Sequence, residues 1–396
     1  MAIASAGVLA MTAVPLIAGS AISGAASKPT YTIGVQGPFT GSDSDYGLYE
    51  YAGVEFAISQ ANASGKYKFK LKAEKFDDQG SSTVAPGAAQ KAAGTKGLVA
   101  IVGPSFSGPS QVSYKYYHQK NIAEVSPSAT AVALASGSDS SFFRTVADDS
   151  VQGSADASYL VTTKGEKTIT VIGDESFYGT GLANVVAAQA TKLGATVTTK
   201  SIANYIEGGG GNAGAYATLA TSLAQSDPSA IFYGGYAGEF GQLLGDLASD
   251  GYTTATHVIM SGDGSNDSSL MTSTSPATAA NGAFLSESAT GKVSYFTGKL
   301  ASEFTALTKV KASVAIYAAQ SYDATDAIIK ALVADKKTSN IATLRKETVA
   351  SLHKVSFVGV TGPISFQGDG DLKVDKGAVQ ISEVDNGVIT LVTSVG

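Results

Sequence analysis

Two stretches of the chain place hydroxyl side chains at the ends of predicted parallel strands, where such groups can bind an anion. Residues 98–102 form an apolar run typical of a buried strand, and a turn rich in glycine, proline and serine follows at residues 103–109. Residues 122–125 predict a second strand, which a serine-rich turn follows at residues 126–130. The hydroxyl side chains of the two turns are Ser105, Ser107, Ser128 and Thr130. Because a turn that opens a helix also offers free backbone N–H groups, both turns together predict a site for a carboxylate or a similar anion.

The same stretch does not have the pattern of a catalytic centre. No histidine lies near the turn at residues 103–109 in sequence to act as a base for one of its serines, and the turn is not a nucleophile elbow. Pro109 is expected at the first position of the helix that follows this turn, and the turn at residues 126–130 is expected to open another helix. We therefore expect these turns to hold a ligand rather than to react with it.

The elements that must position these turns alternate between strand and helix. The first series predicts strands at residues 31–35 and 68–76 and helices at residues 48–63 and 84–94. A second series begins after Arg144, with helices expected at residues 149–163 and 182–193 and strands at residues 168–172 and 196–202. Residues 230–236 and 257–264 each predict a strand that is followed by a turn. Beyond residue 282 the pattern predicts a strand, helices at residues 293–307 and 314–333, and strand-like sequence at residues 378–395. This order favours an α/β fold of two interleaved, doubly wound lobes with parallel sheets flanked by helices.

Composition excludes several classes of function. The 396 residues carry a formal net charge of −6 with only 15% charged residues, and no basic stripe is present, so nucleic acid is not an expected partner. The absence of cysteine excludes thiol catalysis, cysteine-bound zinc, iron–sulfur clusters and disulfides. His118, His257 and His353 are scattered and are expected to be surface or packing residues. We predict no cofactor and no metal, and we interpret Asp77 and Asp78 as a strand end and Asp369 and Asp371 as a turn.

The first 27 residues predict export. They are uncharged and apolar, with small residues near Ser23, which is typical of a secretory signal and its cleavage region. The usual positive charge before the apolar run is missing, and an uncharged stretch of this length can also remain as a membrane anchor. A cleaved signal is the preferred interpretation, and both alternatives place the remaining chain outside the cytoplasm.

From residue 31 onward the chain resembles the type I periplasmic binding proteins, in the branch of the Leu/Ile/Val-binding proteins of ABC importers. The resemblance depends on the order and spacing of short motifs: GPFTG and YG near residues 37–47, FDD at 76–78, VGP at 102–104, SPSAT at 126–130, FRT at 143–145, YGTG at 178–181, YGGY at 233–236, GPISF at 362–366 and GDL at 370–372. It implies two Rossmann-like lobes joined by three crossover strands and closing on a ligand by a hinge. The implied lobes are residues 28–147 with 288–372, and residues 148–287 with 373–396.

The resemblance also implies a binding site for a zwitterion. Ser107, the backbone and hydroxyl of Thr130, and the backbone at Ser128 would bind the ligand carboxylate, and Asp263 would bind the ammonium group. The cleft would be lined by Tyr46, Tyr178 and Tyr236. Each has a simpler alternative, since serine and threonine often cap helices, aspartate before glycine often makes a turn, and tyrosine often packs.

Two positions depart from the family pattern and alter the expected pocket. Ser105 stands where a bulky residue is usual, and Phe106 stands where some members have a half-cystine. Leu, Ile or Val as the ligand is therefore in question, whereas an amino acid or a small amide remains plausible.

Three classes of function follow. The first is an exported solute-binding protein, expected to be monomeric, which captures an amino acid or a similar small polar solute and delivers it to a membrane ABC permease. The second is a ligand-sensing receptor module of the same fold, or a binder of a small amide, urea or carboxylate. The third, an enzyme, is not predicted, because histidine is sparse and no base lies near a nucleophile in sequence.

Overall fold

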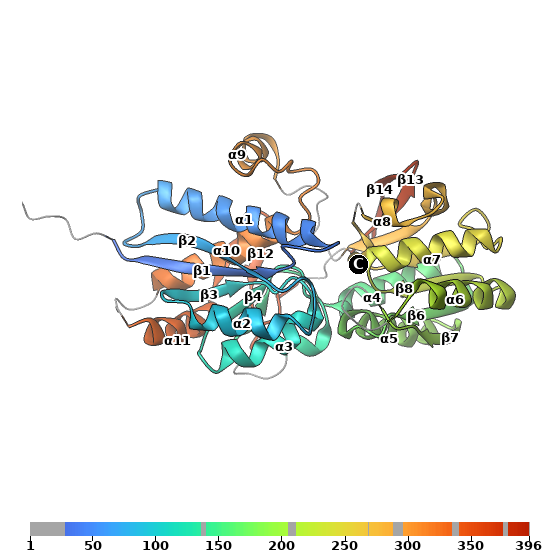
Figure 1. The fold of residues 1–396 in the computed structure, drawn as a ribbon, viewed down its shortest axis with the longest axis horizontal. Helices are drawn as coiled ribbons and strands as arrows, with labels where there is room; N and C mark the ends of the chain where they lie inside the picture. Colours follow the sequence, from blue (N-terminus) through green and yellow to red (C-terminus); the bar gives the residue numbers. More distant parts are fainter. Residues whose placement is uncertain are drawn as a thin grey trace, which may run out of the picture.

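The computed structural model describes residues 28–135, 140–204, 211–267, 269–287, 296–334, 340–374 and 379–395. Two lobes lie side by side along the long axis of the molecule, and each is built on its own sheet flanked by helices (Figure 1). The predicted α/β fold class is confirmed. The expected signal at residues 1–27 lies outside the described residues.

The sheet of the first lobe contains five parallel strands in the order β2-β1-β3-β4-β5. The strands are β1 (Thr30–Gly37), β2 (Lys70–Asp77), β3 (Leu98–Val102), β4 (Ala123–Ser126) and β5 (Phe142–Arg144). All residues of β3 and β4 are buried, because helices cover both faces of the sheet. The strand order reverses direction beside β1, so the loops after β1 and β3 meet at the edge where α/β proteins bind ligands.

Helices from two distant parts of the chain cover this first sheet. They are α1 (Ser44–Ala63), α2 (Ala85–Gly94), α3 (Ser107–His118), α9 (Gly298–Thr308), α10 (Ala318–Ala334) and α11 (Ile341–Leu352). One face packs against α1, α10 and α11, where Val54 and Ile328 meet the strand residues Ile33 and Val35. The other face packs against α2 and α3. A small hairpin of β11 (Ser356–Val358) and β12 (Pro363–Ser365) follows α11.

The sheet of the second lobe has seven strands in the order β14-β13-β10-β9-β8-β6-β7. They are β6 (Thr168–Gly173), β7 (Thr196–Ser201), β8 (Ala230–Gly234), β9 (Val258–Ser261), β10 (Phe284–Glu287), β13 (Val379–Asp385) and β14 (Val388–Val395). The first five strands are parallel, and the last two form an antiparallel hairpin. Asn386 and Gly387 both have positive φ angles, 49° and 76°, as a two-residue hairpin turn requires.

The helices of the second lobe mostly begin at residues that cap them. The α-helices are α4 (Asp149–Ser158), α5 (Phe177–Lys192), α6 (Ala213–Ser226), α7 (Ala237–Ser249) and α8 (Ser269–Ser273). A π-helical turn at Tyr159–Thr163 extends α4, and short 3₁₀ turns lie at Asp263–Ser265 and Ala277–Ala280. The side chains of Asp148, Ser176 and Asn212 accept N–H bonds at the starts of α4, α5 and α6.

The chain passes between the lobes three times: after β5, after β10 and before β13. This confirms the predicted arrangement of two interleaved lobes with three crossovers. The exact boundaries predicted at residues 147, 287 and 372 stay a proposal. Among the helices of the described ranges, none is both long and apolar enough to cross a lipid bilayer.

Three local predictions were wrong. Helix α5 begins at Phe177 rather than at residue 182, because Ser176 caps it by accepting the Gly179 N–H, so Tyr178 lies in its first turn. Helix α3 begins at Ser107, which makes Pro109 its third residue rather than its first. The turn at residues 126–130 opens only a 3₁₀ turn at Val132–Leu134.

Candidate functional site

A pocket lies between the two lobes, at the carboxyl ends of both sets of parallel strands. It is lined by Tyr46, Ser105, Phe106, Ser107, Ser128, Thr130, Tyr178, Tyr236, Asp263, Gly264 and Tyr317. The structure therefore brings together all nine residues singled out in the sequence and adds Gly264 and Tyr317. Their role in binding stays a prediction.

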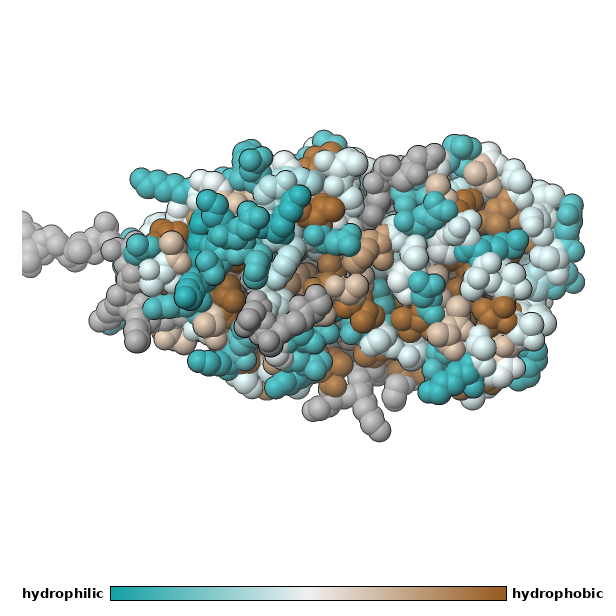
Figure 2. All heavy atoms as spheres, turned by 90° about the horizontal axis from the view of Figure 1, so that it is seen from below, coloured by the Kyte–Doolittle hydropathy of each residue, from teal (hydrophilic) through white to brown (hydrophobic). Residues whose placement is uncertain are grey.

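Five aromatic rings form a continuous wall that runs from one lobe to the other. Tyr317 stacks on Tyr46 at 6.1 Å between ring centroids, and Tyr46 meets the edge of Phe106 at 5.2 Å. Phe106 lies 5.0 Å from Tyr236 of the second lobe, and Tyr236 lies 5.4 Å from Tyr178. In the space-filling view, hydrophobic residues also gather around the junction of the lobes (Figure 2). Because rings of both lobes are in contact, the structure is a closed form with the pocket inside.

The carboxylate end of the pocket is formed by the start of α3. The N-cap position is Phe106, whose side chain does not cap the helix, and Ser107 is the first helical residue. The alternative that Ser107 is only the N-cap of α3 is therefore wrong. Ser107 Oγ accepts a hydrogen bond of 3.2 Å from the Ala131 N–H. That bond uses one of the two lone pairs of Ser107 Oγ, and the hydroxyl proton remains available for an anion beside the helix N-terminus.

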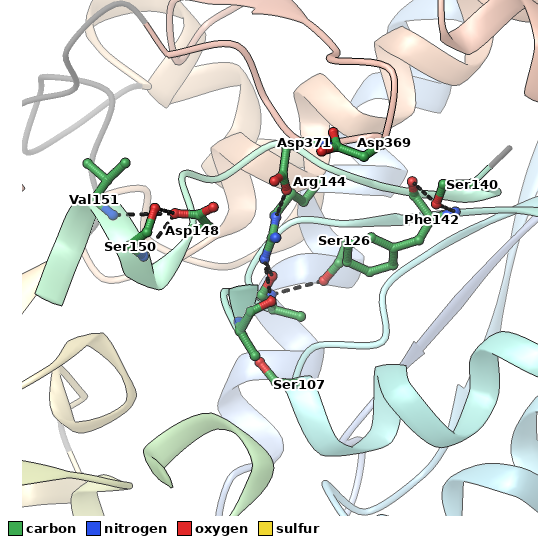
Figure 3. Close-up of polar contacts among 12 residues, drawn as sticks. Ser107, Ser126, Ser140, Phe142, Arg144, Asp148, Ser150, Val151, Asp369 and Asp371 are labelled. Atoms are coloured by element: carbon green, nitrogen blue, oxygen red, sulfur yellow. Dashed lines mark hydrogen bonds and ion pairs between the residues drawn. The ribbon is translucent and has the colours of Figure 1, made fainter. Parts of the chain in front are cut away.

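The turn that carries Ser128 and Thr130 is held by Arg144, at the end of β5. The same side chain contacts Asp371 (Figure 3). Arg144 is fully buried, and its Nη1 donates to the carbonyl oxygens of Ala129 and Ala131 at 3.1 and 3.0 Å. Its Nε donates to Asp371 Oδ1 at 2.5 Å. The carbonyl groups of Ala129 and Ala131 are thus bound by the guanidinium of Arg144 instead of by the N–H groups of a following helical turn. This explains why the helix expected after residues 126–130 does not form.

Hydroxyl groups also tie the two turns of the first lobe to each other. Ser126 Oγ donates to the carbonyl oxygen of Pro104 at 2.7 Å and accepts from the Ala129 N–H at 3.0 Å. The Ser128 N–H makes only a long bond of 3.4 Å to the same hydroxyl. The carbonyl of Thr130 accepts the Asp149 N–H at 2.9 Å, at the point where the chain enters the second lobe. Hydrogen bonds within the protein therefore hold both turns in place.

The opposite end of the pocket carries Asp263, which is buried in the 3₁₀ turn after β9. Tyr178 donates its hydroxyl to Oδ1 and Tyr317 donates to Oδ2, both at 2.7 Å. Burial raises the pKa of Asp263, and the two tyrosine hydrogen bonds lower it in part. These bonds orient the carboxylate, so Asp263 has a fixed position in the pocket and is more than a turn residue.

Further carboxyl groups make this end of the pocket acidic. Asp149 and Asp156 are buried near Asp263, and Glu287 nearby is half-buried. Removal from water raises the pKa of each of the three carboxyl groups, and the charge of Asp263 adds to the rise. None of the eleven pocket-lining residues is basic. A cationic ligand group placed here would relieve the repulsion between these carboxyl groups, so the site favours an ammonium or a similar cation.

Behind the pocket wall lies Glu50, a residue that the sequence reasoning missed. It is fully buried in α1, and its two carboxyl oxygens accept hydrogen bonds of 2.6 Å from the hydroxyls of Ser105 and Ser128. Burial raises the pKa of Glu50 from its ordinary 4.5 to about 8, although both serine bonds lower it. The sequence feature that pointed to Glu50 is its position four residues after Tyr46, which places Glu50 and Tyr46 on one face of the helix.

These raised pKa values predict that the protein loses stability as the pH rises. Burial raises the pKa of Asp78, Asp174 and Glu287 to about 7 each, and that of Glu50 to about 8. Between the ordinary and the raised values, the folded protein keeps protons that the unfolded chain releases. Unfolding then releases protons, so the free energy of unfolding should fall by about 2 kcal/mol or more from pH 6 to pH 8.

Urea unfolding at a series of pH values checks this expectation. The Glu50→Gln variant keeps the shape of the side chain but cannot ionise, so it should lose part of the slope between pH 6 and pH 8. A free energy of unfolding that is constant or rises over this range would contradict the prediction.

The remaining residues considered in the sequence lie outside the pocket. His118 contacts Tyr114 and Ser141, His257 contacts Asp227, and His353 contacts the carbonyl of Ser140. Asp77 and Asp78 accept hydrogen bonds at the end of β2. Asp369 accepts the Asp371 N–H in a turn, but the ion pair of Asp371 with Arg144 was not foreseen. Within the described ranges, no group of three or more His, Asp or Glu side chains is arranged to hold a metal ion.

Tyr317 is the second functional candidate that the sequence did not reveal. The helical pattern of residues 314–333 suggested an interior helical position, whereas α10 begins only at Ala318 and Tyr317 has a φ angle of +57°. The Tyr317 hydroxyl reaches the second lobe, where it binds Asp263. No feature of the sequence around residue 317 signals this turn.

Comparison with protein families gives a match over most of the chain. The family model described as "Periplasmic binding protein" matches residues 30–387. The chain is 30% identical over 223 residues to the Leu/Ile/Val-binding protein of Citrobacter freundii, which is 56% of this chain and 59% of that protein. It is 29% identical over 235 residues to the Leu/Ile/Val-binding protein of Escherichia coli K12, 59% of this chain and 62% of that protein. The alignments thus span about three fifths of these relatives.

Solved structures share the fold. A leucine-binding protein from Thermotoga maritima superposes with a TM-score of 0.76 and 22% identity, over 92% of this chain and 99% of that one. A branched-chain amino-acid transporter substrate-binding protein from Streptococcus pneumoniae, in complex with isoleucine, has a TM-score of 0.73 and 20% identity over the same shares. A solute-binding protein from Rhodopseudomonas palustris, in complex with benzoate, has a TM-score of 0.71 and 18% identity over 92% and 96%.

Proposed function

The chain belongs to the periplasmic binding protein family, in the type I branch that includes the Leu/Ile/Val-binding proteins, and we propose that it binds an amino acid for an ABC importer. The ligand would lie in the pocket between the lobes, and the closed protein would deliver it to a membrane permease. Hinge closure follows from the fact that both lobes contribute to the pocket. Export agrees with the family, and we further propose that residues 1–27 direct it.

One observation carries this proposal: the pocket has a hydrogen-bond-donating end on one lobe and an oriented carboxylate on the other. Ser107 and the start of α3 offer O–H and N–H donors to a carboxylate. Asp263, held by Tyr178 and Tyr317, offers its charge to an ammonium group. A zwitterionic amino acid carries these two groups next to each other, so it matches both ends. Catalysis is not part of the proposal, and neither is a bound metal or cofactor.

A thermal-shift screen of the purified protein against the twenty amino acids, small amides, urea, carboxylates and sugars tests this function. A ligand at 100 times its dissociation constant stabilises the folded state by about 2.7 kcal/mol, which gives a clear rise in melting temperature. We expect rises with amino acids. Rises confined to uncharged amides or to simple carboxylates would overturn the amino-acid proposal, and sustained turnover of any of these solutes would overturn the assignment as a binding protein.

A further inference from the structure

Ser105 and Ser128 form a closed hydrogen-bond network with Glu50 behind the pocket. The two serine hydroxyls lie 2.6 Å from the two carboxyl oxygens of Glu50, and Ser128 Oγ also lies 2.7 Å from the carbonyl oxygen of Ser105. Both serines line the pocket, whereas Glu50 is fully buried and does not. Gly37 packs against Ser105 Oγ, and any side chain at residue 37 would displace that hydroxyl. The local sequence is therefore arranged to keep Ser105 in contact with Glu50.

Every hydroxyl and carboxyl proton of the network is donated to an acceptor within the network. When Glu50 is ionised, each serine donates its hydroxyl proton to one carboxyl oxygen. When Glu50 is protonated on Oε1, its O–H donates to Ser128 Oγ, Ser128 donates to the carbonyl of Ser105, and Ser105 donates to Oε2. The proton belongs on Oε1 because Ser128 has a second acceptor, the carbonyl of Ser105, and Ser105 has none in the network. In both states the serine hydroxyls have only lone pairs left for the cavity. This part of the pocket therefore accepts hydrogen bonds and does not donate them.

Ser107 has the opposite character. Its Oγ accepts the Ala131 N–H and keeps a proton for the cavity. The first lobe thus presents a donor at Ser107 and acceptors at Ser105 and Ser128 to the same pocket. The donor fits the ligand carboxylate of the proposed function, and Asp263 fits its ammonium group. The two acceptors remain for a third ligand group, which is the side chain.

We propose that Ser105 and Ser128, oriented by Glu50, form a subsite that selects an amino acid with a hydroxyl or carboxamide side chain. This inference rests on the proposed function and narrows it to a substrate class. An aliphatic side chain would bury the serine lone pairs without a partner, which costs binding free energy when the lobes close. Glu50 acts here as a positioning residue, because it directs the serine protons away from the ligand.

Isothermal titration of the wild-type protein with two pairs of similarly shaped amino acids tests the subsite. Threonine and valine differ by a hydroxyl in place of a methyl group, and asparagine and leucine differ by a carboxamide in place of an isopropyl group. We expect threonine and asparagine to bind about tenfold or more tightly than their aliphatic partners. Ser105→Ala and Ser128→Ala should each reduce this ratio. The matched control Ser113→Ala should not, since Ser113 is buried but bonds Gln36 outside the pocket.

Glu50→Met gives a separate readout. Methionine has no carboxyl group, so Ser128 can still donate to the carbonyl of Ser105, whereas Ser105 loses its acceptor and its hydroxyl proton becomes available to the cavity. The threonine-to-valine ratio should then fall, whereas a purely structural role of Glu50 would change stability and leave the ratio unchanged.

Two results would overturn the subsite. The first is wild-type protein that binds valine and leucine as tightly as threonine and asparagine, and the second is a preference that persists in the Ser105→Ala/Ser128→Ala double variant. Either result leaves the proposed function intact. If none of the twenty amino acids binds, the proposed function itself is wrong, and this inference fails with it.

Discussion

Replacing Asp263 with asparagine should raise the dissociation constant for the amino-acid ligand by about 30-fold or more. Removing one charge of a buried, hydrogen-bonded pair costs about 2–5 kcal/mol, much of it because the other charge is left unpaired. Asparagine has the same shape as aspartate, so it can still accept from one of the two tyrosine hydroxyls and donate to the other. The charge changes while the turn at residues 263–265 remains. Isothermal titration with the best amino acid from the screen measures the effect.

The control for this prediction is Asp267→Asn, a second buried aspartate four residues away. Asp267 accepts the Ser269 N–H and does not line the pocket, so its replacement should leave the dissociation constant within threefold. Unliganded Asp263→Asn protein should melt at the same temperature as wild type or above it, since repulsion with Asp149, Asp156 and Glu287 is reduced. Affinity unchanged by Asp263→Asn would mean that Asp263 does not bind the ammonium group.

The fold could be predicted from the sequence for those elements whose hydrophobic pattern and length indicate the same type of secondary structure. Buried strands such as residues 98–102 are continuous apolar runs, and the long helix at residues 48–63 has a clear helical period, so both were placed within a few residues. Helix starts were less accurate, because α5 begins at Phe177, directly after a capping serine and five residues before its apolar pattern becomes visible. Contacts with a more distant residue determine the conformation of the turn at residues 126–130, since Arg144 binds the carbonyl groups of Ala129 and Ala131.

The pocket residues divide in the same way: some could be found from local sequence patterns, and others depend on contacts between distant parts of the chain. Residues at the ends of strands, such as Ser107 and Asp263, could be assigned to one cleft because the carboxyl ends of parallel strands converge. Glu50 was missed, since a glutamate on a helix is usually exposed and its spacing from Tyr46 does not show the contact with two distant serines that buries it. Tyr317 depends on a crossover segment whose path across the lobes has no sequence signal. The missed residues are thus those whose partners are more than 50 positions away.

The second large effect is expected at Arg144, which lies at the point where the first lobe, the pocket turn and the returning chain meet (Figure 3). Its guanidinium is fully buried and binds Asp371 and the carbonyls of Ala129 and Ala131. Replacement by methionine fills similar space but leaves a mostly buried carboxylate and two carbonyl groups without their partner. Breaking a buried ion pair in this way costs about 3–5 kcal/mol, so the free energy of unfolding in urea should fall by that amount.

The affinity of Arg144→Met for the ligand should fall as well, because the released carbonyls no longer hold the turn that carries Ser128 and Thr130. Lys72→Met, which breaks the exposed pair with Glu74 at 3.5 Å, is the matched control and should change stability by less than about 1 kcal/mol. In a double-mutant cycle, Arg144→Met with Asp371→Asn should cost less than the sum of the single changes, since no unpaired charge then remains. Additive costs would mean that Arg144 stabilises the protein only through the carbonyls of the pocket turn, and that its contact with Asp371 adds nothing.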